Sequence, residues 1–399
     1  SLVRKDKVAT HLLDDAAEAR GALAEAKNAL HTLMGMKRED FEMLNGAESD
    51  DYDAIAKCYC PSNRPVSVLE GLSAINFVPL EVMRKVHEEL HILTQRISGA
   101  ISKNNKNAAA KKELCGEERL SLALRRWQKL ELDFFRKKNG VFDISKVPDI
   151  YDSAKYDCLH NLNIYPEVFA NIPVIYNLIK PLANVVVPQE NGLSISQKVD
   201  IGRRTCTSLL KKICFDFEMA CNAGVGAGVG VDGEVNIVAQ ARKEENPQKW
   251  HHEETFHHLN AEYANKDDYD GLQSDVMNTL QVRTRLYFTS ESHVHALLNV
   301  LRYFGMEDDK IPDILGEDAR ITLEHMDEFD YLSSVVFKLY ERFDVDLQDP
   351  DRFVVEVWMS QGAHGDIFAT KNHILPIAPL TPLCLESTLQ DFGLFTAAL

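Results

Sequence analysis

The chain has 399 residues, of which 45% are hydrophobic and 26% charged, a composition typical of a folded globular protein rather than a disordered one. Its formal net charge of −17 argues against a general nucleic-acid-binding protein, because such proteins carry a basic surface that replaces phosphate counterions. A polyanionic ligand would need a local basic pocket. No apolar run approaches the roughly 20 residues that cross a bilayer, and eight dispersed cysteines favour a reducing, cytosolic compartment.

Two helical patterns are visible in the first part of the chain. Apolar residues recur at helical spacing from Val8 to Met34, which predicts a long amphipathic helix. After an acidic stretch with glycine and asparagine, Pro79 to Ile101 forms a second helical pattern. We expect residues 1–38 to be a helix that leads out of a catalytic core, and residues 39–115 to be a variable helical insert.

The middle of the chain is also predicted to be mainly helical. A helix is expected from Glu117 to Lys138, with a stop at Asn139 and Gly140. Five prolines between residues 147 and 192 favour loops and short helices there. A further helix is expected from Lys198 to Cys221.

Three patterns in the chain resemble ligand motifs without the context that those motifs need. The Gly-rich loop, residues 222–234, contains a literal Gly-x-Gly-x-x-Gly, but it does not join a strand to a helix as a nucleotide site does. The His-Glu-x-x-His pattern from His87 to His91 lies on a polar helix without a third ligand at a familiar spacing. The histidines between residues 251 and 258 favour a solvated face. We therefore predict no metal site, and a zinc peptidase stays a weak alternative.

Strand-like sequence comes late in the chain. Val282 to Thr289 and Arg352 to Met359 are rich in β-branched and aromatic residues, and a helix is expected between them from Val294 to Phe304. Two or three strands do not form a free-standing sheet of the size that this chain implies. We therefore expect the strands to have partners outside this sequence.

The segment from Arg283 to His295 is the best candidate for a ligand site. It predicts a strand that runs straight into a helix, and the start of such a helix presents free N–H groups and a positive dipole end that suit a phosphate. Val294 belongs to the apolar stripe of this helix, which places Glu291 and His293 near the mouth of a cleft. In the alternative interpretation, His293 only caps the helix.

Several blocks in the same order resemble one known family. They run from about Gly116 to Gly365, whereas residues 1–115 resemble it less. The blocks are Arg125 to Phe134, Lys138 to Asp152, Lys155 to Asp157 with His160 and Asn161, Ala183 to Glu190, Arg283 to Leu297, Arg352 to Glu356, and Ser360 to Ala363. The similarity is to the phosphatase-like domain of the inositol hexakisphosphate and diphosphoinositol pentakisphosphate kinases.

The resemblance implies a histidine acid phosphatase site. In such sites the His of an Arg-His-Gly-x-Arg-x-Pro segment attacks phosphorus, arginines hold the phosphate oxygens, and the Asp of a late His-Asp pair protonates the leaving group. No segment of these 399 residues matches Arg-His-Gly-x-Arg-x-Pro, and the late pair aligns with His293 and Val294. We expect His293 to donate to a phosphate oxygen and Glu291 or His295 to transfer the proton.

A diphosphoinositol polyphosphate carries many negative charges, so an acidic protein must gather cations locally to bind it. The candidates are Arg283, Arg285, Lys155, Arg125 and Arg126. Each of them is alternatively a surface or structural charge.

The resemblance implies an α/β fold, a partial phosphoglycerate-mutase-like core with a dominant, mostly helical inserted domain. Residues 116–280 are then the helical substrate-side domain and residues 281–399 the C-terminal part of the α/β core. The expected function is that of an inositol pyrophosphate phosphatase domain within a bifunctional kinase and phosphatase, with this part alone inactive for lack of the nucleophile. A non-catalytic inositol-phosphate-sensing or regulatory module is the alternative. ATP and Mg²⁺ are expected only for the kinase domain of the parent protein, and no cofactor for this segment.

Overall fold

The computed structural model describes residues 13, 17–41, 66–104, 113–225, 284–324, 328–346, 348–369 and 374–399. The chain divides into two compact units. The first comprises residues 1–214 and 288–399, and the second comprises residues 215–287. Most of the Gly-rich loop, the histidines between residues 251 and 258, and Arg283 lie outside the described residues.

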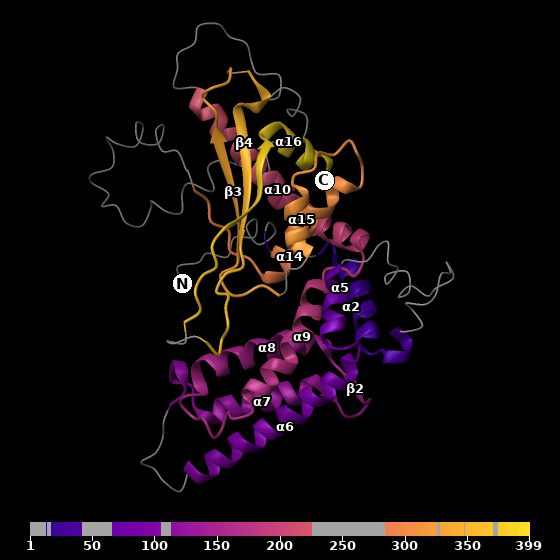
Figure 1. Ribbon diagram of the computed structural model, residues 1–399, viewed down its shortest axis with the longest axis vertical. Coiled ribbons are helices and arrows are strands. Elements are labelled where there is room, and N and C mark those ends of the chain that lie inside the picture. Colours follow the sequence, from indigo (N-terminus) through magenta and orange to yellow (C-terminus); the bar gives the residue numbers. More distant parts are fainter. Residues whose placement is uncertain are drawn as a thin grey trace, which may run out of the picture. The chain divides into compact units, whose positions relative to one another are not determined.

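Helices make up the first half of the first unit. In chain order they are α2 (Arg20–Met34), α5 (Val66–Ala74), α6 (Pro79–Asn104), α7 (Leu120–Phe134), α8 (Val147–Tyr156) and α9 (Ile172–Gln189), with short turns η3 (Cys115–Glu117), η4 (Ile144–Lys146) and η5 (Asp157–Asn161). Helices α6 and α7 both pack on their neighbours in one bundle with α8 and α9 (Figure 1). One continuous apolar core runs through this bundle, because each helix turns its apolar stripe inward.

Helix α7 shows how local sequence sets the bounds of these elements. Its buried residues lie three or four positions apart, as in Trp127, Leu130 and Phe134, which is the spacing of one helical face. The prediction that this helix continues to Lys138 was wrong. The chain leaves the helix at Phe134 and forms a hairpin of β1 (Phe135–Arg136) and β2 (Val141–Phe142), whose turn uses the positive φ of Gly140.

Helix α9 contradicts the expectation of loops and short helices in the proline-rich segment. It is 18 residues long, with Pro173 in its first turn and two further prolines inside it. A proline removes one backbone hydrogen bond, but most side chains of α9 are buried, and their packing outweighs that loss. Helix α5 approaches α9 so closely that a side chain at Gly71 would overlap Val185.

The described residues from 195 onward add four helices and a small sheet. The helices are α10 (Ile195–Val225), α14 (Glu291–Tyr303), α15 (Glu317–Glu324) and α16 (Leu389–Ala398), with turns η8 (Phe304–Met306) and η9 (Pro350–Arg352). The strands β3 (Ser334–Glu341), β4 (Phe353–Ser360) and β5 (Thr381–Thr388) pair in the order β3-β4-β5, antiparallel throughout. Mixed helical and strand content was therefore predicted correctly.

Two strand predictions had opposite outcomes. The predicted strand from Arg352 to Met359 is confirmed as β4. The strand from Val282 to Thr289 is wrong for its described part, because residues 284–290 have no regular structure. β-Propensity reflects packing against neighbouring strands more than a backbone preference, and within the described residues this segment has no strand beside it.

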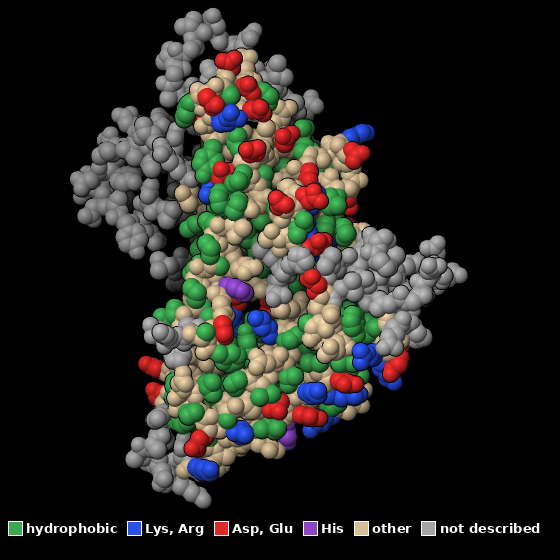
Figure 2. All heavy atoms as spheres, viewed as in Figure 1, with side chains coloured by type: hydrophobic (Ala, Val, Ile, Leu, Met, Phe, Trp, Pro, Cys, Tyr) green, Lys and Arg blue, Asp and Glu red, His purple; other side chains and the backbone are tan. Residues whose placement is uncertain are grey.

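Acidic side chains gather at the connection between β3 and β4 (Figure 2). They include Glu341, Asp344, Asp346 and Asp351, all exposed. Two of these carboxylates pair with arginines of the same connection, Glu341 with Arg352 at 2.6 Å and Asp344 with Arg342 at 3.2 Å. No described helix is long and apolar enough to span a membrane.

Candidate functional site

The candidate site forms where the start of α14 meets the segment that precedes β3. Glu291 occupies the first turn of α14, after Ser290 in the N-cap position. Its Oε1 accepts a hydrogen bond of 3.1 Å from the backbone N–H of Phe329. This bond fixes the segment from Glu328 to Asp330 against the helix.

His295 lies one turn after Glu291 on the same helix. Its ring stacks on Phe329, with 4.1 Å between the ring centroids, and its Nε2 lies 3.4 Å from Glu291 Oε1. Burial lowers the pKa of His295, and the neighbouring carboxylate offsets this only in part. A neutral imidazole beside a carboxylate is suited to relaying a proton.

Four carboxyl groups from three parts of the chain meet here. They are Asp152 from α8, Glu291 from α14, and Glu328 and Asp330 from the segment before β3. Burial, together with the charges of Glu291 and Asp152, raises the pKa of Glu328 to about 9. Burial likewise raises the pKa of Asp152 to about 6. Glu328 is therefore protonated at neutral pH and carries a proton that it can donate.

A lysine and a histidine side chain contact Asp330 in this carboxylate cluster. Lys155, from α8, is 6% exposed and forms an ion pair with Asp330 Oδ1. His364, from the loop after β4, lies with its Nδ1 2.7 Å from the other oxygen of Asp330. Asp330 thus joins α8 to the loop after β4, and the charge of Lys155 is already balanced by a carboxylate.

Gly362 allows the loop after β4 to pack closely against the segment before β3. Gly362 has φ +81°, and a side chain there would overlap the backbone of Tyr331 and Ser333. The neighbouring Ala363 N–H donates to the Tyr331 carbonyl at 2.7 Å. Only glycine combines this backbone conformation with so close an approach, and the Ser-Gln-Gly-Ala block thereby positions the residues around Asp330.

His293 does not lie at the mouth of a cleft, contrary to the sequence prediction. It is 7% exposed, and its Nε2 lies 3.7 Å from Cys206 Sγ of α10. Val294 is only partly buried. The apolar stripe of α14 therefore differs from the predicted one by one residue, because both histidines, and not Val294, turn inward.

The predicted cations are dispersed over the chain. Arg125 is exposed on α7. Arg285 belongs to the second unit, where its guanidinium pairs with Asp216 at 3.0 Å, and Arg283 lies outside the described residues. Among the candidates that the structure describes in the first unit, Lys155 alone lies at the carboxylate cluster.

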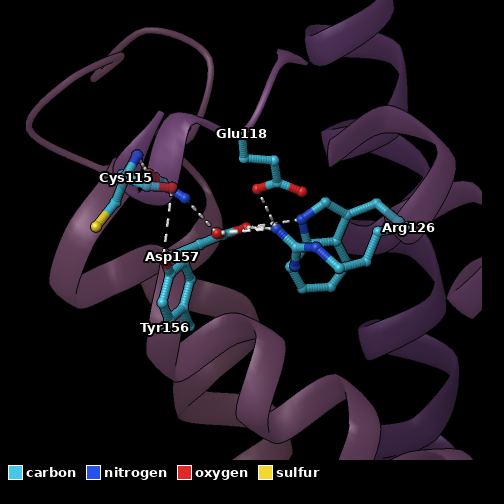
Figure 3. A network of polar contacts seen from close by, with 7 residues as sticks. Cys115, Glu118, Arg126, Tyr156 and Asp157 are labelled. Atoms are coloured by element: carbon cyan, nitrogen blue, oxygen red, sulfur yellow. Dashed lines mark hydrogen bonds and ion pairs between the residues drawn. The ribbon is translucent and has the colours of Figure 1, made fainter. Parts of the chain in front are cut away.

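Arg126 belongs to a buried polar network between α7 and η5 (Figure 3). It contacts Glu118 at 3.3 Å and Asp157 at 3.1 Å. The fully buried Asp157 also accepts hydrogen bonds of 2.8 Å from Trp127 Nε1 and 2.7 Å from Asn161 Nδ2. These contacts give Arg126 a structural role, the neutralisation of a buried carboxylate.

The His-Glu-x-x-His pattern serves packing. His91 Nδ1 lies 2.8 Å from Glu131 Oε1, and the ring of His87 packs on Phe135, with 4.9 Å between centroids. Among the residues that the structure describes, no group of three or more metal-binding side chains is placed to hold an ion.

Comparison with known proteins decides the family. The sequence model of the histidine phosphatase superfamily (branch 2) matches residues 22–360 of this chain. The chain belongs to this superfamily. The resemblance seen in the sequence is thereby confirmed, and the mixed helical and strand architecture is that of a histidine phosphatase. No solved structure matches this member of the superfamily.

The curated relatives of this histidine phosphatase domain are inositol phosphate kinases. Inositol hexakisphosphate and diphosphoinositol-pentakisphosphate kinase 2 of Mus musculus is 34% identical over 355 residues, 89% of this chain and 26% of the relative. The Homo sapiens protein of that name is 33% identical over 355 residues, 89% of this chain and 24% of the relative. Inositol hexakisphosphate and diphosphoinositol-pentakisphosphate kinase 1 of Rattus norvegicus is 35% identical over 316 residues, 79% of this chain and 18% of the relative. The chain spans about a quarter of the length of the first of these relatives.

Sequence reasoning missed Asp152, Glu328, Asp330 and His364. Asp152 had an available signal, because it lies three residues before Lys155 and therefore on the same face of a helix. The other three come from irregular segments around the sheet, where no periodic pattern indicates which residues meet.

Proposed function

We propose that this chain is the phosphatase-like domain of a bifunctional inositol pyrophosphate kinase and phosphatase, and that it acts on the phosphoanhydride of diphosphoinositol polyphosphates. The observation that carries the proposal is the family match over residues 22–360, together with relatives named for inositol hexakisphosphate and diphosphoinositol pentakisphosphate. In the family's chemistry, a histidine attacks the terminal phosphorus, a P–N bond forms, and the bridging P–O bond breaks. Water then cleaves the phosphohistidine.

The attacking histidine of this reaction has no counterpart in the 399 residues, since none of them form an Arg-His-Gly-x-Arg-x-Pro segment. We propose that hydrolysis requires a protein that carries both this domain and such a segment. The chain by itself is then inactive. It supplies residues that surround the substrate and the leaving group.

The replacement of the usual proton-donating Asp by Val294 fits a phosphoanhydride. The group that leaves is a phosphate monoester, whose second pKa is about 6, whereas a sugar alcohol leaves as a far more basic alkoxide. A phosphate therefore leaves without full protonation. A site that lacks a strong proton donor would hydrolyse the anhydride and spare the monoesters.

Any proton that is still required would come from the carboxylate cluster. Glu328 is the best candidate, because it retains its proton at neutral pH. Glu291 and His295 lie within 3.4 Å of each other and provide a relay beside it. His293 remains a candidate donor to a phosphate oxygen, although it now faces Cys206.

Lys155 is the cation that we propose for substrate binding. Asp330 already holds it, so a substrate phosphate would have to displace that carboxylate. This exchange favours a highly charged ligand, because several phosphates attract Lys155 more strongly than one carboxylate does. Arg125, Arg283 and Arg285 remain proposed contacts.

One observation favours the alternative of a non-catalytic module that senses inositol phosphates. The late His-Asp pair of the family is here His293 and Val294, and His293 is buried. A module of this kind would bind diphosphoinositol phosphates without releasing phosphate. We further propose that residues 39–115 are a variable insert, that residues 116–280 form the substrate-side domain inserted in the α/β core, and that the protein is cytosolic.

The test is phosphate release from a diphosphoinositol pentakisphosphate. It would be measured for this chain and for a longer protein that carries the same domain and an Arg-His-Gly-x-Arg-x-Pro segment. We expect release only from the longer protein, at least tenfold slower with Glu328→Gln and unchanged with Glu386→Gln, an exposed Glu on β5. Appreciable turnover by this chain alone would contradict the missing nucleophile, and tight binding without turnover by the longer protein would favour the sensor.

A further inference from the structure

A cavity of about 40 Å³ lies against α14, next to the candidate site, with which it shares His295 and Phe329. A single water needs about 10–15 Å³, so the cavity holds more than one water. Its walls come from α10, α14, α15 and the end of α9. The residues that line it and carry polar side chains are Lys198, His295, Asn299, Arg302 and Tyr303.

Lys198 is a buried cation on one side of the cavity. It is 3% exposed, and its Nζ donates to the backbone carbonyl of Pro188 at 2.8 Å. No carboxylate of the described chain forms an ion pair with it. Burial, and to a smaller extent the charge of Arg302, lowers the pKa of Lys198 to about 7.

Arg302 supplies a second buried cation, one that is only partly satisfied. Its Nη2 pairs with Glu324 Oε1 at 2.7 Å, but its Nε has no hydrogen-bond partner among the described residues. The same holds for Asn299 Nδ2 and the Tyr303 hydroxyl, both on α14. Asn299, Arg302 and Tyr303 are three or four residues apart or adjacent, at the C-terminal half of the helix.

Water alone in the cavity does not account for these buried polar and charged groups. Buried donors without an acceptor cost about 1–3 kcal/mol each, and two buried like charges repel each other. Water would satisfy the donors but would leave Lys198 without a counter-charge, whereas Arg302 already pairs with Glu324. An anion satisfies the donors and balances the charge of Lys198, and a tetrahedral oxyanion matches the donors in number, because it offers several acceptor oxygens at once.

We propose that this cavity binds one tetrahedral oxyanion group, a phosphate or a sulfate, held by Lys198, Arg302, Asn299 and Tyr303. The cavity is too small for an inositol ring with its phosphates. The group is either a free inorganic anion or a single phosphoryl group of a larger ligand whose remainder stays outside. This site does not depend on the proposed phosphatase activity, and neither Glu328 nor Lys155 lines it, although it shares His295 and Phe329 with the candidate site.

The test measures sulfate binding to the chain by calorimetry at pH 6, below the pKa of Lys198, with chloride at equal ionic strength as the background. We expect saturable 1:1 binding that Lys198→Met weakens at least tenfold and Tyr303→Phe weakens severalfold. The control is Lys211→Met, an exposed lysine on the same helix α10, which should bind as the unchanged protein does. Methionine at position 198 removes a buried charge, so this variant should fold at least as stably in the absence of sulfate.

Two outcomes would overturn the proposal. One is the absence of saturable sulfate binding to the unchanged protein, and the other is equal binding by the Lys198→Met variant. Competition identifies the source of the oxyanion. Displacement of sulfate by inositol hexakisphosphate, lost in Lys198→Met, supports a phosphoryl group of a larger ligand, and displacement by inorganic phosphate alone supports a free anion.

Discussion

Glu328 should make the stability of this domain fall as the pH rises. In the folded chain its pKa is about 9, against an ordinary value of 4.5. Between these values the folded state binds a proton that the unfolded state has lost, so the free energy of unfolding decreases with increasing pH. Each pH unit in this window costs about 1.4 kcal/mol. From pH 6.5 to pH 8, the contribution of Glu328 is therefore a loss of about 2 kcal/mol.

The perturbation that isolates this effect is Glu328→Gln, which keeps the shape of the side chain and removes its titration. Other groups titrate in the same range, among them Lys198 with a pKa of about 7, but they do so in both proteins and cancel in the difference. Urea unfolding at pH 6.5, 7.2 and 8 should therefore give a shallower decline for the variant. The variant should gain about 2 kcal/mol relative to the unchanged protein between the lowest and the highest pH.

Glu386→Gln provides the matched control, because this glutamate is exposed on β5 and should leave the pH dependence unchanged. Infrared spectroscopy gives an independent readout. The unchanged protein should show a protonated carboxyl band at pH 7.5 that Glu328→Gln removes. Equal pH dependence in the two proteins, together with an unchanged carboxyl band, would refute the assignment of a proton to Glu328.

Three further predictions concern structure and chemistry. Asp157→Asn should destabilise the helical bundle by about 3–5 kcal/mol in urea unfolding, because it removes the buried negative charge that Arg126 neutralises and replaces one of the two acceptor oxygens by an NH2 donor; a loss below about 1 kcal/mol would mean that the network is not structural. Gly362→Ala should cost about 1–3 kcal/mol and slow phosphate release by the longer protein, since the new methyl group pushes Tyr331 away; unchanged stability would show that the loop adapts. Val294→Asp in the longer protein should add hydrolysis of phosphate monoesters, and no gain would argue against the role given to this position.

Helices with regular apolar spacing were predictable from the sequence. The patterns that indicated α6, α10 and α14 follow from burial of one face, and the β-branched run of β4 follows from burial within a sheet. Helix α9 was not predictable from local rules, because its prolines signal a break that only tertiary packing overrides. Strand β3 had the composition of a strand but was missed, and β5 contains a proline, Pro382, which weakens the strand signal.

The candidate site was only partly readable in the sequence. Glu291 and His295 belong to one helix, so their spacing of four residues places them together. Their partners Glu328 and Asp330 reach them through folding, since neither lies in a periodic element. The inward turn of His293 was also missed, because a stripe of apolar residues does not reveal which neighbouring histidines share the buried face.

The selectivity between anhydride and ester tests the central claim most directly. Phosphate release would be measured side by side from diphosphoinositol pentakisphosphate and inositol hexakisphosphate, with the longer protein that carries this domain. We predict release from the phosphoanhydride and none from the monoesters, because Val294 replaces the proton donor that an alkoxide leaving group needs. Equal release from both substrates would contradict the account.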